Sequence, residues 1–390
     1  MNTGRISLWE LFTLFLRIGS TAFGGFMALI AVVESNVVER RKWLTHEEML
    51  DGVSLATVLP GPVAVNTVAY VGHRLRGVSG AVVSTIGVIL PSFLLLLALS
   101  AAYFTWGQLP VVSKLFMGFI PAVTAIILVA AWNMGRKAIQ GRIEAVIALI
   151  AAVLMVWKGG FIVSLLIILC AGVAGWLLFR APAAASSKQA DGAKKGQSKL
   201  LGVAVAPVLL TVPFWSVNSA MLLKLFMTFA GMSLFLFGGG YVFIPLIQNI
   251  VVVGNGWLTQ QEFVDAIAMG QITPGPILIS AAFIGYKVAG FFGALVATIG
   301  IFMPPALLMI ASSHALNRIK KSALIKAVLR GIRPAVIGMI VAAVIAVGMT
   351  AQQHWASLLI FALALLAQLR FKLDVVWVIP VAGLTGLLLY

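Results

Sequence analysis

The chain has 390 residues, of which 61% are apolar and only 10% are charged, and its mean hydropathy is +1.08. A typical soluble domain has about 25% charged residues, so this composition excludes a soluble enzyme. It also excludes a disordered chain, because disorder requires low hydrophobicity and high charge. We therefore predict an all-α polytopic membrane protein.

The net charge of +16 does not indicate nucleic-acid binding. Lysines and arginines occur in short clusters between apolar runs, which is the pattern of cytoplasmic loops under the positive-inside rule. A nucleic-acid-binding domain would instead gather them on one face. We expect no nucleic-acid partner.

The apolar runs form two groups, each of which predicts about five transmembrane helices. They lie at 8–33, 78–104, 115–134, 143–157 and 159–179, and then at 200–217, 221–253, 288–312, 334–349, 356–369 and 375–390. Several runs are shorter than the roughly 20 residues of an upright spanning helix. The predicted organisation is an N-terminal repeat (1–180), a flexible cytoplasmic linker (181–199), an extra apolar segment (200–217) and a C-terminal repeat (218–390).

The two groups are copies of each other. Three motifs recur at an offset of 214 residues: Phe-Gly-Gly at 23–25 and 237–239, Trp-Leu-Thr at 43–45 and 257–259, and Pro-Gly-Pro at 60–62 and 274–276. After a one-residue gap, glycines and prolines continue to match at an offset of 213, from Gly72 and Gly285 to Pro121 and Pro334. Chance does not preserve such a register, so the chain contains an internal duplication.

Loop charge predicts opposite orientations for the two copies. The segment 34–52 has three cations at 40–42 and its counterpart 248–266 has none, whereas 313–330 has five and its counterpart 105–114 has one. By the positive-inside rule the repeats are inverted in the membrane. Five crossings per repeat require that 8–33 crosses once and that 200–217 does not span. If Phe-Gly-Gly instead marks a re-entrant hairpin, 200–217 becomes a crossing.

A capping box precedes each Pro-Gly-Pro motif. Thr45 and Glu48, like Thr259 and Glu262, have the spacing at which a threonine hydroxyl and a glutamate satisfy the first amides of a helix. Such a helix ends before the first proline, and Pro62 can start the next one. We therefore predict broken or re-entrant helices at both Pro-Gly-Pro motifs.

A broken helix within a membrane needs protein or a water-filled cavity around its free backbone groups. The N-terminus of the following helix attracts anions, so two opposed breaks could form one anion site. The alternative is that the prolines only kink a packed helix. The predicted substrate-binding residues are the motif residues and nearby polar side chains: Gly24, Gly25, Thr57, Pro60, Gly61, Pro62, Asn66, Gly238, Gly239, Gln271, Thr273, Pro274, Gly275, Pro276 and Ser280.

Charged residues provide further candidates for electrostatic attraction or coupling, namely Arg17, Glu34, Arg74, Lys287 and Arg333. Arg17 lies within an apolar run, where a charge is costly and therefore a functional candidate, although it could also extend to the interface. Arg74 and Lys287 match across the copies and could attract an anion or hold a lipid phosphate. The four histidines have no metal-ligand spacing, so we expect no metal and no cofactor.

The doubled order of Phe-Gly-Gly, Trp-Leu-Thr and Pro-Gly-Pro resembles the chromate ion transporter family in its long-chain, two-domain form. The resemblance covers nearly the whole chain except the linker. It implies a multi-pass protein of the bacterial inner membrane, a secondary-type transporter that exports chromate and confers chromate resistance. Chromate resembles sulfate in shape and charge, so sulfate is a further expected substrate or competitor. Membrane lipid and a second copy of the chain, in a homodimer, are the other partners considered.

Three alternatives remain open. A transporter or exchanger of sulfate or another oxyanion would have the same features, and an anion channel can also contain inverted half-helices. An intramembrane enzyme would need convergent carboxylates or histidines for acid–base or metal chemistry. The chain has only 11 acidic residues, nearly all in loops or at helix ends, so we expect no enzymatic activity.

Overall fold

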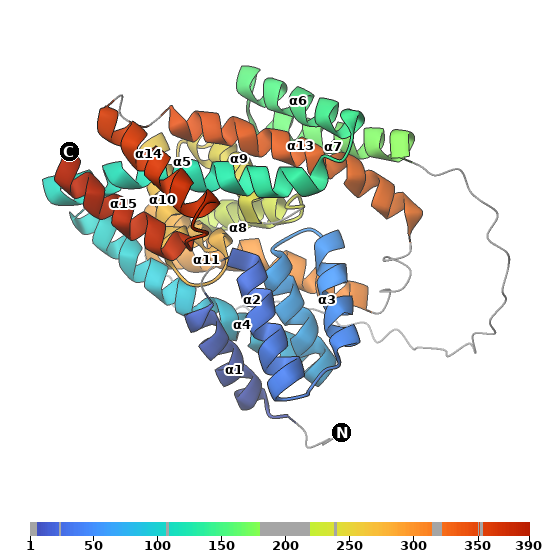
Figure 1. Ribbon diagram of the computed structural model, residues 1–390. Coiled ribbons are helices and arrows are strands. Elements are labelled where there is room, and N and C mark those ends of the chain that lie inside the picture. The colour runs from blue at the N-terminus through green and yellow to red at the C-terminus, as the bar shows by residue number, and fades with distance from the viewer. Residues whose placement is uncertain are drawn as a thin grey trace, which may run out of the picture.

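The computed structural model describes residues 6–22, 25–106, 109–179, 219–237, 240–313, 322–349, 351 and 354–390. Within these ranges the secondary structure is helical and contains no strand (Figure 1). Five of the described helices are long and apolar enough to cross a membrane. The predicted all-α polytopic class is therefore confirmed. The linker 181–199 and the segment 200–217 lie outside the described residues.

The helices follow the same order in both halves. The first half contains α1 (Leu8–Thr21), α2 (Gly25–Glu34), the π-helix η1 (Ser35–Arg40), α3 (His46–Val58), α4 (Val63–Trp106), α5 (Pro110–Ala138), α6 (Arg142–Trp157) and α7 (Phe161–Phe179). The second contains α8 (Ser219–Ser233), η2 (Gly240–Val242), α9 (Phe243–Gln248), the π-helix η3 (Asn249–Gly254), α10 (Gln260–Ile272), η4 (Ile277–Ile279), α11 (Ser280–Ser313), α13 (Ala323–Gly348), α14 (Trp355–Leu369) and α15 (Val375–Leu389).

The long helices α4 and α11 each fold back on themselves at equivalent positions. The backbone leaves helical geometry at Gly77 (φ +65°) and at Gly290 (φ +59°). A Cβ atom at Gly72 would lie 2.4 Å from the carbonyl oxygen of Gly80, although residues eight apart in a continuous helix are about 12 Å apart. Each helix therefore has a short arm before the break, 63–75 or 280–288, and a long arm after it.

The long arms form the centre of each half. A Cβ atom at Gly87 of α4 would lie 2.9 Å from the carbonyl oxygen of Phe12 in α1, and one at Gly300 of α11 would lie 3.0 Å from that of Phe226 in α8. Glycine allows this close backbone approach in both halves. The same helix pair thus recurs with the same contact residue.

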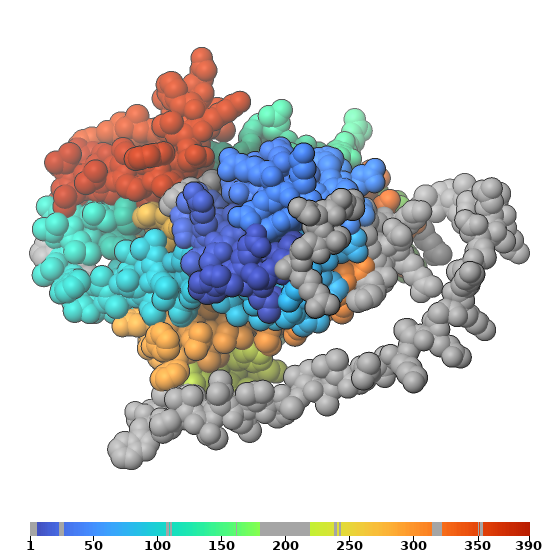
Figure 2. Space-filling view, turned by 90° about the horizontal axis from the view of Figure 1, so that it is seen from below, coloured from blue at the N-terminus to red at the C-terminus, as the bar shows by residue number. Residues whose placement is uncertain are grey.

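The last helices of each half pack against the other half. A Cβ atom at Gly118 of α5 would lie 2.2 Å from the carbonyl oxygen of Ala382 in α15, and one at Gly331 of α13 would lie 2.1 Å from that of Ala171 in α7. Figure 2 shows the red C-terminal helices lying against the teal residues of the first half. The two halves are therefore interlocked through an exchange of equivalent helices.

The equivalent helices α5 and α13 lie side by side and run antiparallel (Figure 1). A Cβ atom at Gly135 would lie 3.4 Å from Ile337, and one at Gly348 would lie 3.4 Å from Thr124. The end of each helix is thus beside the middle of the other, and Lys137 near the end of α5 lies close to Arg333 of α13.

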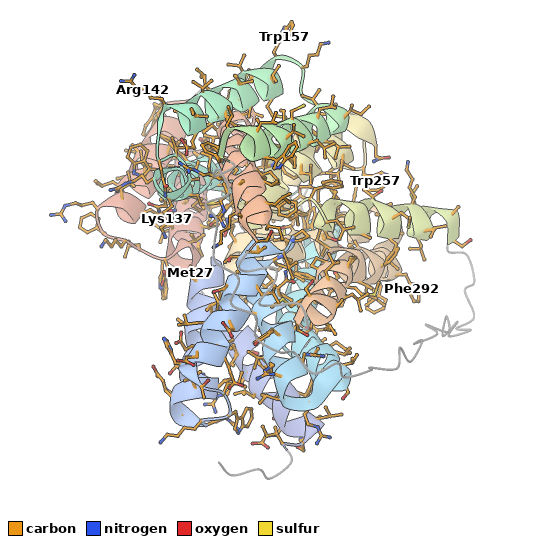
Figure 3. All side chains as sticks on the ribbon, turned by 90° about the vertical axis from the view of Figure 1, so that its right-hand side faces the viewer. Met27, Lys137, Arg142, Trp157, Trp257 and Phe292 are labelled. Carbon is orange, nitrogen blue, oxygen red and sulfur yellow. The ribbon has the colours of Figure 1, made fainter. Side chains whose placement is uncertain are left out.

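The outer helices have large apolar side chains on their exposed surfaces. Examples are Leu149 on α6, 64% exposed, and Leu358 on α14, 73% exposed. Trp157, at the end of α6, projects from the molecule in Figure 3. Such a surface is suited to a hydrocarbon environment rather than to water.

Candidate functional site

Each Pro-Gly-Pro motif lies at the tip of a helical hairpin. In the first half α3 packs against the short arm of α4, since a Cβ atom at Gly52 would lie 2.3 Å from the Tyr70 ring. In the second half α10 packs against the start of α11, where a Cβ atom at Gly270 would lie 2.1 Å from Ser280 Oγ. We call residues 60–62 the first tip and residues 274–276 the second tip.

The predicted capping boxes are confirmed at the base of both hairpins. The Thr45 hydroxyl accepts the amide of Glu48 while the Glu48 carboxylate accepts the amide of Thr45, and Thr259 and Glu262 form the same pair. The helices that begin there, α3 and α10, each have 13 residues and end just before the tip. Capping and proline therefore set both ends of each helix.

Each tip is hydrogen-bonded to the other half. The amide of Gly61 donates to the carbonyl of Leu236 at 2.7 Å, and the amide of Gly275 donates to the carbonyl of Ala22 at 3.1 Å. Ala22 and Leu236 each directly precede a Phe-Gly-Gly motif. Such a reciprocal exchange of contacts is characteristic of a two-fold relation between the halves.

Only glycine suits the centre of a tip. Gly61 has φ +104° and Gly275 has φ +106°, a region that residues with a Cβ atom rarely adopt. A Cβ atom at Gly61 would also lie 2.3 Å from Pro305, and one at Gly275 would lie 2.5 Å from Ser92 Oγ. Ser92 Oγ donates a hydrogen bond to the carbonyl of Pro274, so α4 holds the second tip directly.

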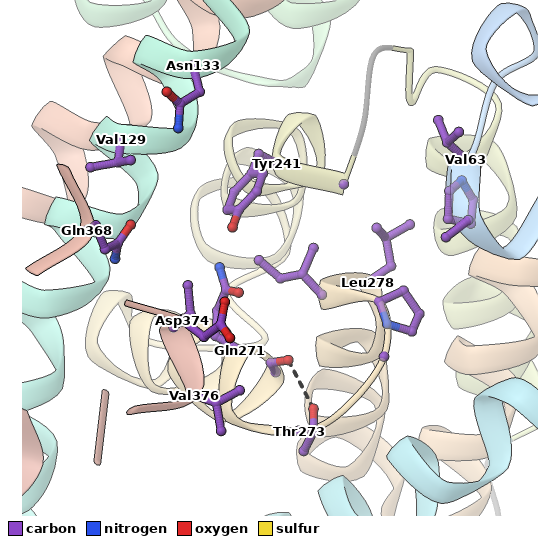
Figure 4. Close-up of a pocket in the computed structure, with 18 of the residues that line it drawn as sticks. Val63, Val129, Asn133, Tyr241, Gln271, Thr273, Leu278, Gln368, Asp374 and Val376 are labelled. Atoms are coloured by element: carbon purple, nitrogen blue, oxygen red, sulfur yellow. Dashed lines mark hydrogen bonds between the residues drawn. The ribbon is translucent and has the colours of Figure 1, made fainter. Parts of the chain in front are cut away.

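A cavity of about 530 Å³, the main cavity, lies between the two tips (Figure 4). Its wall includes residues 62–64 at the start of α4 and residues 275–278 at the start of η4. Amides in the first turn of a helix have no acceptor within that helix. Two helix N-termini, with the positive ends of their dipoles, therefore border one cavity.

Polar side chains complete the wall of the main cavity, and its charged members are Arg136, Lys372 and Asp374. In Figure 4 the Tyr241 hydroxyl and the Gln271 amide lie near each other, while Asn133 and Gln368 enter from α5 and α14. The Nε2 atoms of Gln271 and Gln368 are buried without an acceptor among the described residues. Because a buried unpaired donor is costly, these amides are suited to an oxygen-rich anion.

Two further cavities continue from the main one. The second, of about 410 Å³, shares Asn133, Tyr241 and Gln368 with the main cavity and adds Thr57, Met27, Lys137 and Arg333. The third, of about 460 Å³, shares Thr57, Lys137 and Arg333 with the second and adds Lys326 and Arg330. Met27 and Lys137 are labelled in Figure 3. The row of cavities therefore extends from the tips to the basic ends of α5 and α13.

The structure places part of the predicted binding set on these walls: Thr57, Pro62, Gln271, Thr273, Gly275 and Pro276. Arg333, one of the charged candidates, also lies on them. Other members support the tips from behind: Asn66 Nδ2 donates to the carbonyl of Pro60 at 3.0 Å, and Ser280 Oγ donates to that of Ile277 at 2.8 Å. Gly61 and Pro274 lie within the tips. Gly25 begins α2. The predictions for Gly24, Gly238 and Gly239 lie outside the described residues.

The remaining charged candidates are not in the cavities. Arg74 forms an ion pair with Glu48, and Lys287 forms the equivalent pair with Glu262 at 2.8 Å. Both cations thus hold the base of a hairpin and are neutralised there. The Glu34 carboxylate lies 2.7 Å from His46 Nδ1, and Arg17 is exposed on α1.

The capping glutamates have lowered pKa values. The backbone amide of Thr45 and the Arg74 guanidinium both lower the pKa of Glu48, against an opposing effect of burial. At Glu262 burial raises the pKa, but the Lys287 ammonium and the amide of Thr259 outweigh it, so the net pKa is also lowered. Both carboxylates are therefore stabilised in their charged form.

The sequence motifs did not identify three residues that line the main cavity, namely Tyr241, Asn133 and Gln368. Tyr241 occupies the place of Met27 in the other copy, so comparison of the repeats does not select it. Asn133 and Gln368 are amides near the ends of apolar helices, where an uncompensated polar group is costly. That cost was the available signal for these two residues.

The comparisons with known proteins identify a family. A family model described as chromate transporter matches residues 9–176 and again residues 223–387. A probable chromate transport protein of Synechococcus elongatus is 32% identical over 98% of this chain and 96% of its own length. The chromate transport protein of Cupriavidus metallidurans is 31% identical over 98% and 94%. An uncharacterized transporter of Methanocaldococcus jannaschii is 32% identical over 92% and 89%. No solved structure matches the chain.

Proposed function

Because this chain belongs to the chromate transporter family, we propose that it exports chromate from the cytoplasm across the bacterial inner membrane and thereby confers resistance. It acts as a secondary transporter, and the main cavity between the two tips is its substrate site. Sulfate, a dianion of similar shape, competes at this site.

The observation that supports this site most strongly is the meeting of the two tips. Each tip donates its glycine amide to the other half, and the helix starts behind both tips border one cavity. Binding sites of secondary transporters commonly lie at the interface of inverted repeats, with half-helix N-termini directed at anionic groups. The antiparallel pair α5 and α13 is the arrangement expected of inverted repeats.

The dimensions of the hairpins agree with this placement. A helix of 13 residues, such as α3 or α10, is about 20 Å long, whereas the hydrocarbon core of a membrane is about 30 Å thick. A hairpin that enters from one side would therefore bring its tip near the middle. Two hairpins from opposite sides would place both tips at the depth of the main cavity.

The donors around the cavity are suited to a tetrahedral dianion. Helix N-termini and the buried amides of Gln271 and Gln368 can donate hydrogen bonds to its four oxygens. In a site of low dielectric such bonds are stronger than in water. Chromate and sulfate present the same charge and shape to these donors, which is the reason to expect competition.

The test measures uptake of labelled chromate into everted membrane vesicles. Gln271→Glu places a negative charge where the dianion binds, so we expect uptake to fall to the background of vesicles without the protein. Gln260→Glu is the matched control because it lies on the same helix and still accepts the 3.0 Å hydrogen bond from Gln248. Unlabelled sulfate in excess should reduce uptake by the unmodified protein. Wild-type uptake by Gln271→Glu would refute the site, and the absence of chromate uptake by the unmodified protein would refute the function.

A further inference from the structure

The third cavity has an unbalanced positive charge. Its wall contains Lys137, Lys326, Arg330 and Arg333 and no acidic side chain from the part of the chain that the structure describes. Arg330 is neutralised by Glu144, at 2.9 Å, and its guanidinium lies 4.2 Å from the centre of the Phe179 ring. The other three cations form no salt bridge with any described carboxylate. About three positive charges therefore face the space within this cavity.

The helices themselves bring these cations together. Lys326, Arg330 and Arg333 follow the i, i+4, i+7 spacing that places residues on one face of α13. Lys137 comes from the end of α5, which runs antiparallel beside α13. The wall also has hydroxyl and amide donors at Ser54, Thr57 and Gln140. Such a cluster in a cavity with partly apolar walls concentrates its field on an entering anion.

Lys137 and Arg333 also line the second cavity, which shares Tyr241 and Asn133 with the main cavity. An anion in the third cavity is therefore one cavity removed from the tips. We propose that the third cavity is an entry vestibule, a second binding site that takes up a dianionic oxyanion before it reaches the main cavity. This inference rests on the proposed function for the identity of the anion.

The duplication shows that the four cations of the vestibule have no charged counterparts in the other copy. At an offset of 213, the positions of Lys326, Arg330 and Arg333 correspond to Ser113, Met117 and Ile120, and that of Lys137 corresponds to Thr350. None of these four is charged. The cations of the vestibule lie in or beside the loops that the positive-inside rule assigns to the cytoplasm. The vestibule therefore favours capture of the anion from the cytoplasmic side and has no counterpart to recapture it on the other.

The first test compares kinetics in everted vesicles, whose cytoplasmic face is outside. For the double variant Lys326→Gln and Arg333→Gln we expect the KM for chromate to rise about tenfold, the low end of the range for electrostatic focusing, with maximal rate within twofold of wild type. The salt dependence of KM should weaken at the same time. The single variant Arg333→Lys retains the positive charge and should keep a KM close to that of the wild type. The control, Lys114→Gln with Lys158→Gln, removes two charges outside the three cavities.

The second test does not depend on transport. Binding of sulfate and of chromate to the purified full chain is measured by calorimetry in the Gly275→Ala background, which disables the second tip. We expect binding to remain there and to be lost when Lys137, Lys326 and Arg333 are also replaced by glutamine. Unchanged affinity in that variant, or an unchanged KM in the double variant, overturns the vestibule. Absence of chromate flux with charge-dependent binding intact would instead contradict the proposed function alone.

Discussion

The two tips and the two ends of the α5–α13 pair show how differently parts of a duplicated chain can diverge. The tips have the same sequence, nearly the same glycine φ angles of +104° and +106°, and reciprocal hydrogen bonds. The ends differ, because one has four lysines and arginines at cavity positions and the matching positions of the other are uncharged. Backbone geometry requires particular residues at the tips, whereas charge on a cavity wall can change without loss of the fold. The tips, which are alike in both halves, are suited to binding the anion. The basic cluster, whose matching positions are uncharged, is suited to setting the direction of transport.

The largest effect that tests this comparison is expected at the two tip glycines. Gly61→Ala and Gly275→Ala should each reduce chromate uptake to less than about a tenth of the wild-type value. Each variant adds a Cβ atom at positive φ and against a fixed neighbour. If the tips are equivalent, both variants should lose chromate uptake to a similar degree. Gly231→Ala is the control, since its Cβ atom would have no neighbour within 4 Å. Loss in only one tip variant would show that the tips are not equivalent.

A smaller effect is expected at a contact that only one tip has. Ser92 donates to the second tip, whereas its counterpart Pro305 packs on the first tip without a hydroxyl. Ser92→Ala should lower the free energy of unfolding by about 1 kcal/mol, the typical loss for a hydrogen bond. Thermal unfolding in detergent measures this difference. Ser100→Ala, which removes a hydroxyl bonded to Leu96 within its own helix, should have less effect, and an equal effect would contradict a special role for Ser92.

The smallest effect concerns the capping glutamates at the base of the hairpins. Their pKa values are lower in the folded protein than in the unfolded chain, so their contribution to stability is present at neutral pH and decreases as the pH falls through these lowered values. Glu48→Gln and Glu262→Gln should each lower the unfolding temperature slightly at pH 7. The difference from wild type should narrow in acid, where the native carboxylates become protonated. A difference that is constant with pH would exclude the ionic part of the cap.

The hairpins themselves were largely predictable from local sequence. The Thr-x-x-Glu spacing and the prolines predicted where α3 and α10 begin and end, because caps and proline act over three or four residues. The fold-back at Gly77 and Gly290 was not predicted, since a glycine in an apolar run is equally compatible with a straight packed helix. Arg74 and Lys287 were considered as anion attractors, but their glutamate partners lie about 25 residues earlier and are brought near only by the hairpin.

By itself, the sequence determined the membrane class, the duplication, the opposite charge of matching loops and the positions of the helix breaks. Each of these follows from composition, from residues close in the chain or from aligning the two copies of the repeat. Tertiary structure alone decided that each tip is held by the other half, that α5 packs against α15 and α13 against α7, and that amides from distant helices meet in the main cavity. These contacts join residues that are far apart in the chain, such as Gly118 and Ala382. Their geometry depends on how whole helices pack, which no local pattern specifies.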